Sequence, residues 1–272
     1  MMRLLRIVIT VLFVAAAVLF ARDWYHSEIK ADKTLPVITI EGDMLEVDFN
    51  ATDEDLLMGV TAYDEKDGDL TGRVIVESIS KFTEIGVCKV YYAVCDNDNH
   101  VASASRKITY RGYTSPQFTL NRALCFSQLE AINTADIIGA TDVLDGDISS
   151  SIILTSSDYE YGVVGKYSVK AEVSNSKGDQ ISLTFPMIVE DRNINAPNIE
   201  LSRYLMYVPL GTPIDPAAYF VSARDSYEID VSGTLYMENN YQQNQEGIYS
   251  FHYYATDSLG RVGHSILLVV VE

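Results

Sequence analysis

The sequence has little positive charge and only one long apolar run. Its 20 lysines and arginines stand against 38 aspartates and glutamates, so the formal net charge is −18. Binding to nucleic acid depends on neutralising phosphates with lysine and arginine, so this balance argues against nucleic acid as a partner. Beyond the N-terminus, no long stretch repeats apolar residues with the 3.6-residue period of a helix, which argues against a helix-rich fold. The hydrophobic content of 47% is typical of a globular chain.

Cysteines are also few, and their spacing does not suit a disulfide framework. Cys88 and Cys95 lie in CKVYYAVC, a pattern typical of a single strand. Their odd separation places the two side chains on opposite faces, too far apart for a bridge. Cys125 could pair with either of them only across a domain boundary. We therefore expect three free thiols, mostly buried.

No ordered catalytic motif is present. The four histidines, His26, His100, His252 and His264, are scattered along the chain, and no nucleophile elbow accompanies a serine. His252 is expected on the solvent-facing side of its strand, next to Tyr254. We predict that the protein is not an enzyme and that it has no cofactor.

The N-terminus predicts a membrane-spanning helix. Residues 7–21, IVITVLFVAAAVLFA, contain no charge, and Arg3 and Arg6 precede them. Counted from Leu4, the run is 18 residues interrupted only by Arg6, which is near the lower limit for crossing a bilayer, and the preceding positive charge favours a cytoplasmic N-terminus. Trp24 and Tyr25 follow at the position of an interfacial aromatic belt. The alternative is a signal peptide cleaved near residues 15–17 or 21, which would give a secreted protein.

Three copies of one strand pattern follow the apolar run. They are GVCKVYYAVCDNDN at 86–99, GKYSVKAEVSNSKG at 165–178 and GIYSFHYYATDSLG at 247–260. In each copy every second residue is apolar, which is the pattern of a half-buried strand, and a polar turn follows. The residues expected to face the core are Cys88, Val90, Tyr92 and Val94; Tyr167, Val169, Ala171 and Val173; and Tyr249, Phe251, Tyr253 and Ala255.

Each copy belongs to a repeat of about 80 residues that opens with a proline-led strand and closes with another strand. Short strands with frequent turns predict β-sandwiches. We predict an all-β fold of three tandem immunoglobulin-like sandwiches after an N-terminal transmembrane helix, with single helical turns at TDEDLLMG (capped by Thr52), TADIIG and DPAAYF. The predicted segments are an anchor at 1–21, a stalk at 22–34, and domains at 35–112, 113–191 and 192–272.

The first repeat resembles the bacterial immunoglobulin-like domains of surface proteins. The resemblance rests on PVITI, AYDEKDGDLT, GVCKVYYAVCD and RKITY, and it extends over residues 35–272 as three units. The third unit departs from the pattern, with DSYEID in place of D-x-x-D-G-D. Cys88 stands where the family usually has tyrosine, and Asn99-His100 where it has Gly-Asn. The resemblance implies adhesion, spacing or envelope assembly at the cell surface.

A repeated acidic string allows two interpretations. Its carboxylates offer the oxygen ligands that calcium takes, but the string lacks the spacing of an EF-hand loop. Asp-Gly also supplies the backbone geometry of a tight turn, and aspartate accepts local backbone N–H groups. In the third copy Ile229 replaces the glycine, so we favour a turn and predict no metal site. The strings are Asp64, Asp67 and Asp69; Asp142, Asp145 and Asp147; and Asp225, Glu228 and Asp230.

Tyrosines in the third repeat are the candidate binding residues. Tyr236 and Tyr241 flank MENN in a predicted loop, and exposed aromatics on a rigid scaffold suit a binding tip. Three domains of roughly 30 Å placed end to end would hold this tip about 90 Å from the membrane. We therefore predict a membrane-anchored surface protein that binds a glycan or protein ligand at its distal domain. The alternative is a non-catalytic spacer or envelope-assembly subunit without a ligand.

Overall fold

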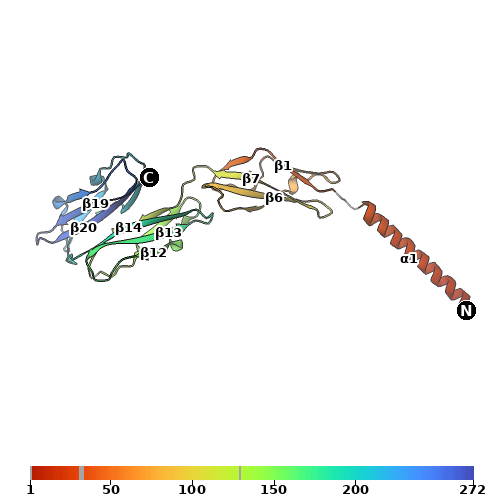
Figure 1. Ribbon diagram of the computed structural model, residues 1–272, viewed down its shortest axis with the longest axis horizontal. Helices are drawn as coiled ribbons and strands as arrows, with labels where there is room; N and C mark the ends of the chain where they lie inside the picture. Colours follow the sequence, from red (N-terminus) through yellow and green to blue (C-terminus); the bar gives the residue numbers. More distant parts are fainter. Residues whose placement is uncertain (1, 31–33, 129) are drawn as a thin grey trace. The chain divides into compact units, whose positions relative to one another are not determined.

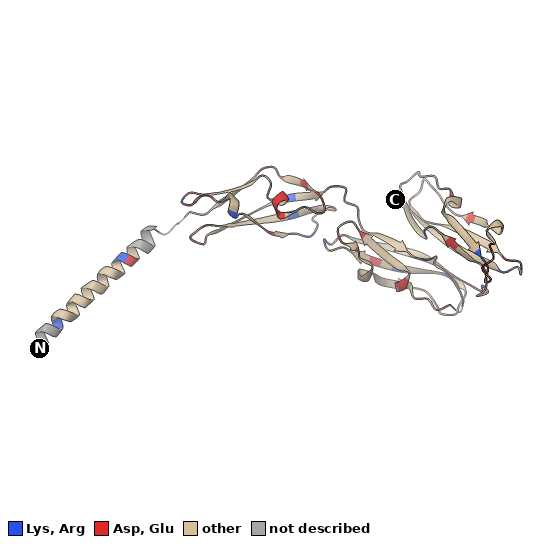
Figure 2. Ribbon diagram, turned by 180° about the vertical axis from the view of Figure 1, so that it is seen from behind, with Lys and Arg blue, Asp and Glu red and all other residues tan. Residues whose placement is uncertain are grey.

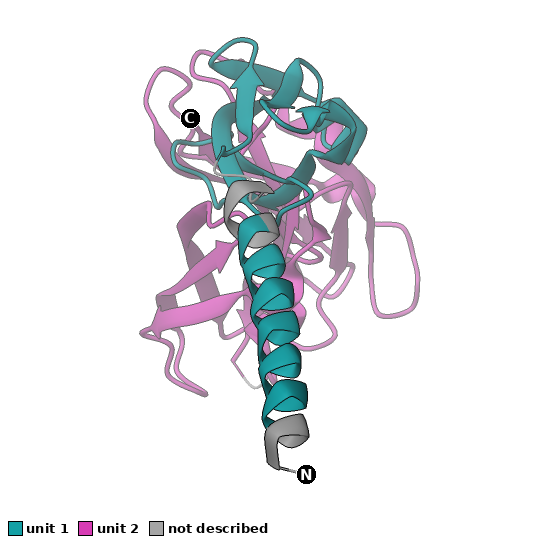
Figure 3. Ribbon diagram, turned by 90° about the vertical axis from the view of Figure 1, so that its right-hand side faces the viewer, with its two compact units in different colours: residues 1–111 teal, residues 112–272 magenta. Residues whose placement is uncertain are grey.

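The computed structural model describes residues 2–30, 34–128 and 130–272, and side chains in 6–25, 34–128 and 130–272. The chain divides into two compact units, residues 1–111 and residues 112–272, which are coloured separately in Figure 3. Apart from one long N-terminal helix, the secondary structure is almost entirely β, arranged as sandwiches of two sheets (Figure 1). The predicted all-β class is confirmed.

Helix α1 (Met2–Lys30) contains the apolar run and continues through most of the predicted stalk. Its middle part carries no charged residue, and charges occur only toward its two ends (Figure 2). The segment Arg6–Tyr25 is long and apolar enough to cross a bilayer, and its described side chains are exposed. A membrane anchor and a signal sequence both meet this description.

Unit 1 contains one sandwich. One sheet has the order β1 (Val37–Ile40), β3 (Val60–Asp64), β4 (Gly68–Asp69), and the other β2 (Met44–Val47), β7 (Val101–Tyr110), β6 (Val87–Cys95), β5 (Ile75–Ile79). The expected inner face of β6 is confirmed, because Cys88, Val90, Tyr92 and Val94 are all buried in the core. Cys95 is exposed on the opposite face, and all three cysteines are free thiols as predicted.

Unit 2 contains four sheets. Two belong to residues 113–191, in the orders β11 (Gly146–Asp147), β10 (Ile138–Asp142), β8 (Gln117–Leu120) and β12 (Ile153–Ser157), β13 (Gly165–Ser174), β14 (Gln180–Glu190), β9 (Cys125–Ser127). The others are β15 (Asn198–Leu201), β17 (Phe220–Arg224) and β16 (Leu205–Val208), β20 (Val262–Val271), β19 (Gly247–Thr256), β18 (Tyr236–Asn239). The residues of the predicted second and third domains therefore lie in one compact unit.

The two parts of unit 2 pack against each other through the outer face of β20. Ile266 and Leu268 point away from the core of their own sheet and are buried in the hydrophobic cluster that contains Phe126 and Met187. Strand β20 is therefore buried on both faces over most of its length. The end-to-end arrangement predicted for these two repeats is wrong, because the outer face of the last strand is apolar and is covered by its neighbour.

Short helical turns occur where the sequence predicted them. Helix α2 (Asp53–Leu56) has a capping box in which the Thr52 side chain accepts from the Asp55 backbone and the Asp55 side chain accepts from the Thr52 backbone. The turns η2 (Thr134–Asp136) and η4 (Pro216–Tyr219) occupy TADIIG and DPAAYF, and Asp215 caps the latter. Further single turns are η1 (Thr71–Arg73), η3 (Ser149–Ser151) and η5 (Ser232–Thr234).

Candidate functional site

The two predicted binding tyrosines occupy different environments. Tyr236 is the first residue of edge strand β18 rather than part of a loop, and 56% of its surface is exposed. Tyr241 follows that strand and is partly buried. Its ring packs against Tyr249 and Phe251, and its hydroxyl donates to the Thr212 carbonyl. Tyr236 is therefore available to a ligand, whereas Tyr241 contributes to the core.

The acidic strings brace turns, as predicted. The buried Asp64 carboxylate accepts from the backbone N–H groups of Lys66 and Asp67, at 2.8 and 2.9 Å, and Asp69 accepts from Thr71. Equivalent bonds link Asp142 to Leu144 and Asp145 in unit 2. One carboxylate oxygen of Asp64 and one of Asp142 thus each accept two local backbone N–H groups, as the turn interpretation expects.

The third copy makes a related turn without glycine, with its left-handed residue shifted by one position. Gly68 and Gly146 have φ angles of +78° and +73°, in the left-handed region that favours glycine. In the third copy the left-handed residue is Glu228, at φ +62°, one position before the isoleucine that replaces the glycine. Asp225 still accepts from Tyr227 and Ile229. The braced turn therefore survives loss of the Asp-Gly pair.

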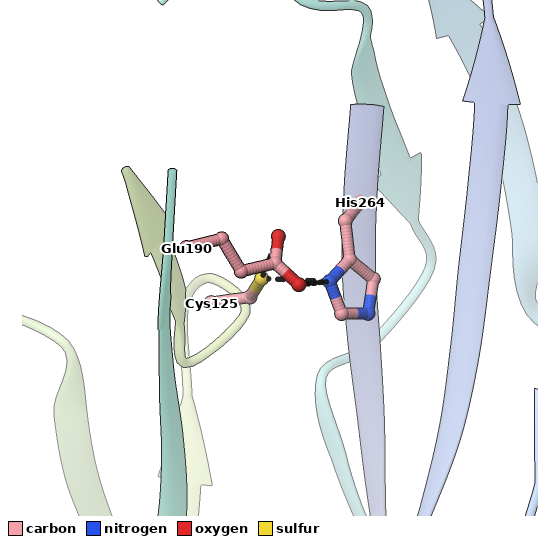
Figure 4. Close-up of side chains that lie close together, drawn as sticks. All are labelled: Cys125, Glu190 and His264. Atoms are coloured by element: carbon pink, nitrogen blue, oxygen red, sulfur yellow. Dashed lines mark hydrogen bonds and ion pairs between the residues drawn. The ribbon is translucent and has the colours of Figure 1, made fainter. Parts of the chain in front are cut away.

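A polar cluster lies where the two parts of unit 2 meet. Strand β9 supplies Cys125, the parallel neighbour β14 ends with Glu190, and β20 supplies His264 from its outer face (Figure 4). These side chains converge because β9 and β14 pack on the outer face of β20. Cys125 and His264 are buried, and the Glu190 side chain is 31% exposed.

The Cys125 thiol and the Glu190 carboxylate lie at the same ring nitrogen of His264. The Nδ1 atom of His264 lies 2.7 Å from Glu190 Oε1 and 3.0 Å from Cys125 Sγ, and Sγ lies 3.6 Å from Glu190 Oε2. A nucleophilic triad needs the thiol and the carboxylate on opposite ring nitrogens, so that the base can relay a proton. Because both groups lie at Nδ1, this cluster lacks the geometry of a triad.

A second layer of side chains holds the His264 ring. Its Nε2 atom lies 3.0 Å from Nδ1 of His252, whose other ring nitrogen lies 2.9 Å from the Ser250 hydroxyl. Tyr254 stacks on the His264 ring at 4.4 Å between centroids, and Tyr236 stacks on Tyr254 at 6.0 Å. His252 is thus partly buried, and the prediction that it is solvated is wrong because β13 and β14 lie against this face of its sheet.

Charges in the cluster are set by burial and by direct contacts. Burial and the nearby Glu190 charge raise the pKa of the Cys125 thiol far above its ordinary value, so the thiol is protonated at neutral pH. Burial, the largest single influence, opposes ionisation of Glu190, but the hydrogen bond and charge of His264, the charge of Arg192 and the bond from Cys125 together outweigh it and lower the pKa of Glu190. Burial, followed by the charge of His264, lowers the pKa of His252. The cluster therefore carries a carboxylate beside a neutral thiol.

A pocket of about 390 Å³ adjoins the cluster and is lined by both Cys125 and His264. Two arginines also line it. Arg192 donates to the carbonyls of His264 and Cys125, at 2.6 and 3.4 Å. These acceptors are uncharged, so they do not neutralise the guanidinium. Arg122 bonds Glu130 at 2.6 Å and lies over the Phe126 ring. The pocket thus contains one cationic group bonded to neutral carbonyls, Arg192, and one cation paired with a carboxylate, Arg122 with Glu130.

Sequence reasoning missed this cluster, although one signal pointed to it. The run ILLVVV in β20 does not alternate between apolar and polar residues, and such a run is typical of a strand buried on both faces. A histidine just before that run is therefore expected to be buried rather than solvated. Nothing in the local sequence places Cys125 or Glu190 beside it, because the three residues come from distant strands.

Comparisons with known proteins give distant relatives only, and no protein-family model matches the chain. The pesticidal crystal protein Cry22Aa of Bacillus thuringiensis is 26% identical over 225 residues, 79% of this chain and 30% of that protein. An uncharacterized 81.3 kDa protein of Acholeplasma phage L2 is 31% identical over 138 residues, 49% of this chain and 18% of that protein. The chain thus spans less than a third of the length of these two relatives.

Among solved structures, the chain is similar to one of CBM51-2 in complex with GlcNAc and INT domains from Clostridium perfringens ZmpB. The identity is 20%, the match covers 51% of this chain and 28% of that chain, and the TM-score is 0.23. A functional conclusion for this protein therefore depends on its own residues.

Proposed function

We propose that the protein is a non-catalytic bacterial surface protein that binds a ligand through its C-terminal unit. Helix α1 anchors it in the cell membrane with the N-terminus in the cytoplasm, and residues 34–272 lie outside. The three repeats form three immunoglobulin-like domains with the boundaries predicted from the sequence. Support comes from the apolar helix that precedes an otherwise β-sandwich chain.

The pocket beside Cys125 and His264 carries the binding proposal. It brings Arg122 and Arg192 together with hydroxyl and carboxylate groups, among them Ser127 and Glu130. Hydrogen-bonding and cationic groups around one hollow suit a hydroxyl-rich or acidic glycan better than an apolar ligand. Its ligand class is therefore an envelope or host-surface glycan.

Tyr236 is a second candidate contact, and one experiment separates the two surfaces. The purified full-length protein in detergent is applied to an array of glycans, cell-wall fragments and matrix proteins. We expect saturable binding that Arg122→Ala weakens and that Tyr236→Ala leaves unchanged. The Arg122 side chain is half-exposed, so we expect its removal to leave the fold intact, which circular dichroism of the variant checks. Loss of binding with Tyr236→Ala alone would move the site to the edge strand.

A spacer or assembly subunit is the second candidate, and the exposed edge strands favour it. Strands β5, β12 and β18 occupy equivalent edges of the three sandwiches, and each begins with an exposed apolar side chain: Ile75, Ile153 and Tyr236. Unpaired edges with apolar side chains can pair with another chain. This function would be supported instead if nothing on the array binds the protein and the protein self-associates with rising concentration. Ile153→Lys should then abolish the self-association.

A further inference from the structure

We propose that Cys125, Glu190 and His264 bind one zinc ion at the junction of the two parts of unit 2. Their ligand atoms, a sulfur, a carboxylate oxygen and a ring nitrogen, all lie within 4.8 Å of one another. This inference goes beyond ligand binding in the pocket. Zinc can bind here whether or not the pocket binds a glycan.

The donor set selects the metal. Thiolate and imidazole are ligands for zinc and similar transition metals, whereas calcium and magnesium take oxygen ligands. Zinc with three protein ligands keeps a fourth position for water or another donor. Since Cys125 and His264 both line the pocket, a water molecule or a bound ligand can reach that position.

The distances require only a small expansion. Bonds of about 2.3 Å to sulfur and about 2.0–2.2 Å to nitrogen and oxygen place tetrahedral ligand atoms roughly 3.3–3.6 Å apart. The Sγ–Nδ1 and Nδ1–Oε1 distances of 3.0 and 2.7 Å are shorter, and the Sγ–Oε2 distance of 3.6 Å already fits. The Glu190 side chain is partly exposed and can move to lengthen the Nδ1–Oε1 distance. The Sγ–Nδ1 distance must lengthen by about half an ångström, through rotation of the Cys125 or His264 side chain.

The charge balance also favours a cation. Zinc binding replaces the thiol proton, which leaves to solvent, and the Cys125 thiolate and Glu190 carboxylate together neutralise the two charges of the ion. His264 binds through Nδ1 as a neutral ring, with its proton on Nε2 directed at Nδ1 of His252. A ligating histidine is commonly oriented in this way by a hydrogen bond from its other nitrogen.

The test is metal binding by the full-length protein in detergent, first stripped of metal with a chelator. Zinc is titrated in competition with a chromophoric chelator, and cobalt(II) is titrated as a spectroscopic substitute. We expect one equivalent of each metal and a sulfur-to-cobalt charge-transfer band. Cys125→Ser abolishes that band and Glu190→Gln weakens zinc binding, while Cys95→Ser, which removes an exposed thiol in unit 1, changes neither.

A variant of His252, which bonds the His264 ring but is not a ligand, tests whether the orientation of that ring contributes to zinc binding. His252→Ala keeps all three ligands and is expected to weaken zinc binding by about 10–100-fold, as loss of a second-layer partner does in other zinc sites. The proposal is overturned if the folded wild-type protein binds no zinc, or if cobalt binds without a charge-transfer band. It is also overturned if zinc affinity is unchanged in Cys125→Ser. Circular dichroism of each variant establishes that it is folded.

Discussion

The same pair of strands is used differently in the two units. In unit 1 the outer face of β7 carries Ser103, Ser105, Lys107 and Thr109, which are exposed or half-buried. The equivalent positions of β20 in unit 2 are His264, Ile266, Leu268 and Val270, and all four are buried. Both strands pair in the same register with the strand before them. The two strands differ in the side chains of their outer face, which are polar in β7 and mostly apolar in β20.

This difference shows how a repeat acquires an interior site. A sandwich needs only one apolar face per sheet, so the outer face can change without loss of the fold. Where that face is polar, as in β7, solvent covers it. Where it is apolar, as in β20, it is covered by a neighbour, and polar residues at its margin become buried together. His264 and His252 belong to such a margin.

The largest loss of stability is expected from a substitution on the buried outer face of β20. Ile266→Ala leaves a cavity in the shared cluster and is expected to destabilise unit 2 by about 2–5 kcal/mol. Ser105→Ala at the equivalent exposed position of unit 1 should change stability by less than about 0.5 kcal/mol. Urea unfolding followed by peptide-resolved hydrogen exchange assigns the change to a unit. Equal effects at the two positions would contradict the comparison.

A smaller effect is expected at a buried arginine that unit 1 has and unit 2 lacks. Arg106 bonds the Tyr92 hydroxyl and the carbonyls of Leu56 and Met58, at 2.9, 2.7 and 2.7 Å, and Leu267 occupies its position in the third repeat. Arg106→Leu leaves the partly buried Met58 carbonyl without this donor and removes one of the two donors to the Leu56 carbonyl, the other being the Tyr92 hydroxyl. It should lower the free energy of unfolding of unit 1 by about 1–3 kcal/mol.

The same unfolding measurement provides the control. Tyr253, the counterpart of Tyr92, bonds the Pro216 carbonyl instead. Arg106→Leu combined with Tyr92→Phe should lose more than the sum of the two single variants, because both side chains donate to the Leu56 carbonyl and only the double variant removes both donors. An additive loss in the double variant would show that the two side chains do not act together.

Helix capping gives a still smaller difference between the units. Thr52→Ala removes the cap of α2 and should cost about 1 kcal/mol in unit 1. Asp215→Ala removes the corresponding cap of η4 in unit 2, where Pro216 pre-sets the backbone of the turn. We expect a smaller loss there. Thermal unfolding of the two variants, compared with the wild type, measures both.

The smallest expected effect is a pH dependence. Burial opposes ionisation of Asp96, but the N–H groups and ring of His100 and the N–H of Asp98 outweigh it and lower its pKa. A lowered folded pKa stabilises the protein above the unfolded value near 3.8, and this stability is lost as pH falls through the folded pKa. Asn175 accepts the same pair of backbone bonds in the second repeat without titrating.

Asp96→Asn should therefore keep the turn and reduce the loss of unit 1 stability below about pH 4. The melting temperature of the variant and of the wild type is measured between neutral pH and pH 3. Parallel curves for the two proteins would show that Asp96 does not contribute to the acid sensitivity. Asp257→Asn is the matched variant in unit 2, because the pKa of Asp257 is lowered by bonds to Arg261 and Leu259, again against the effect of burial.

Much of the fold could be predicted because it depends on local patterns. Alternation at 88–94 and 249–255 identified the core faces, and Thr52 with Asp55 identified a capped turn. The acidic strings were assigned to turns because aspartate bonds its own neighbouring backbone. The location of Tyr236 was mispredicted, since a four-residue edge strand has no sequence signal distinct from a loop.

By itself, then, the sequence determined the apolar helix, the three repeated strand patterns and the turns between them, because each depends on residues a few positions apart. Tertiary structure decided which sheet faces are covered, and so decided that Cys125, Glu190 and His264 meet. These residues lie on three strands separated by 65 and 74 positions along the chain. Only the packing of one sandwich on the outer face of the next brings their ligand atoms together.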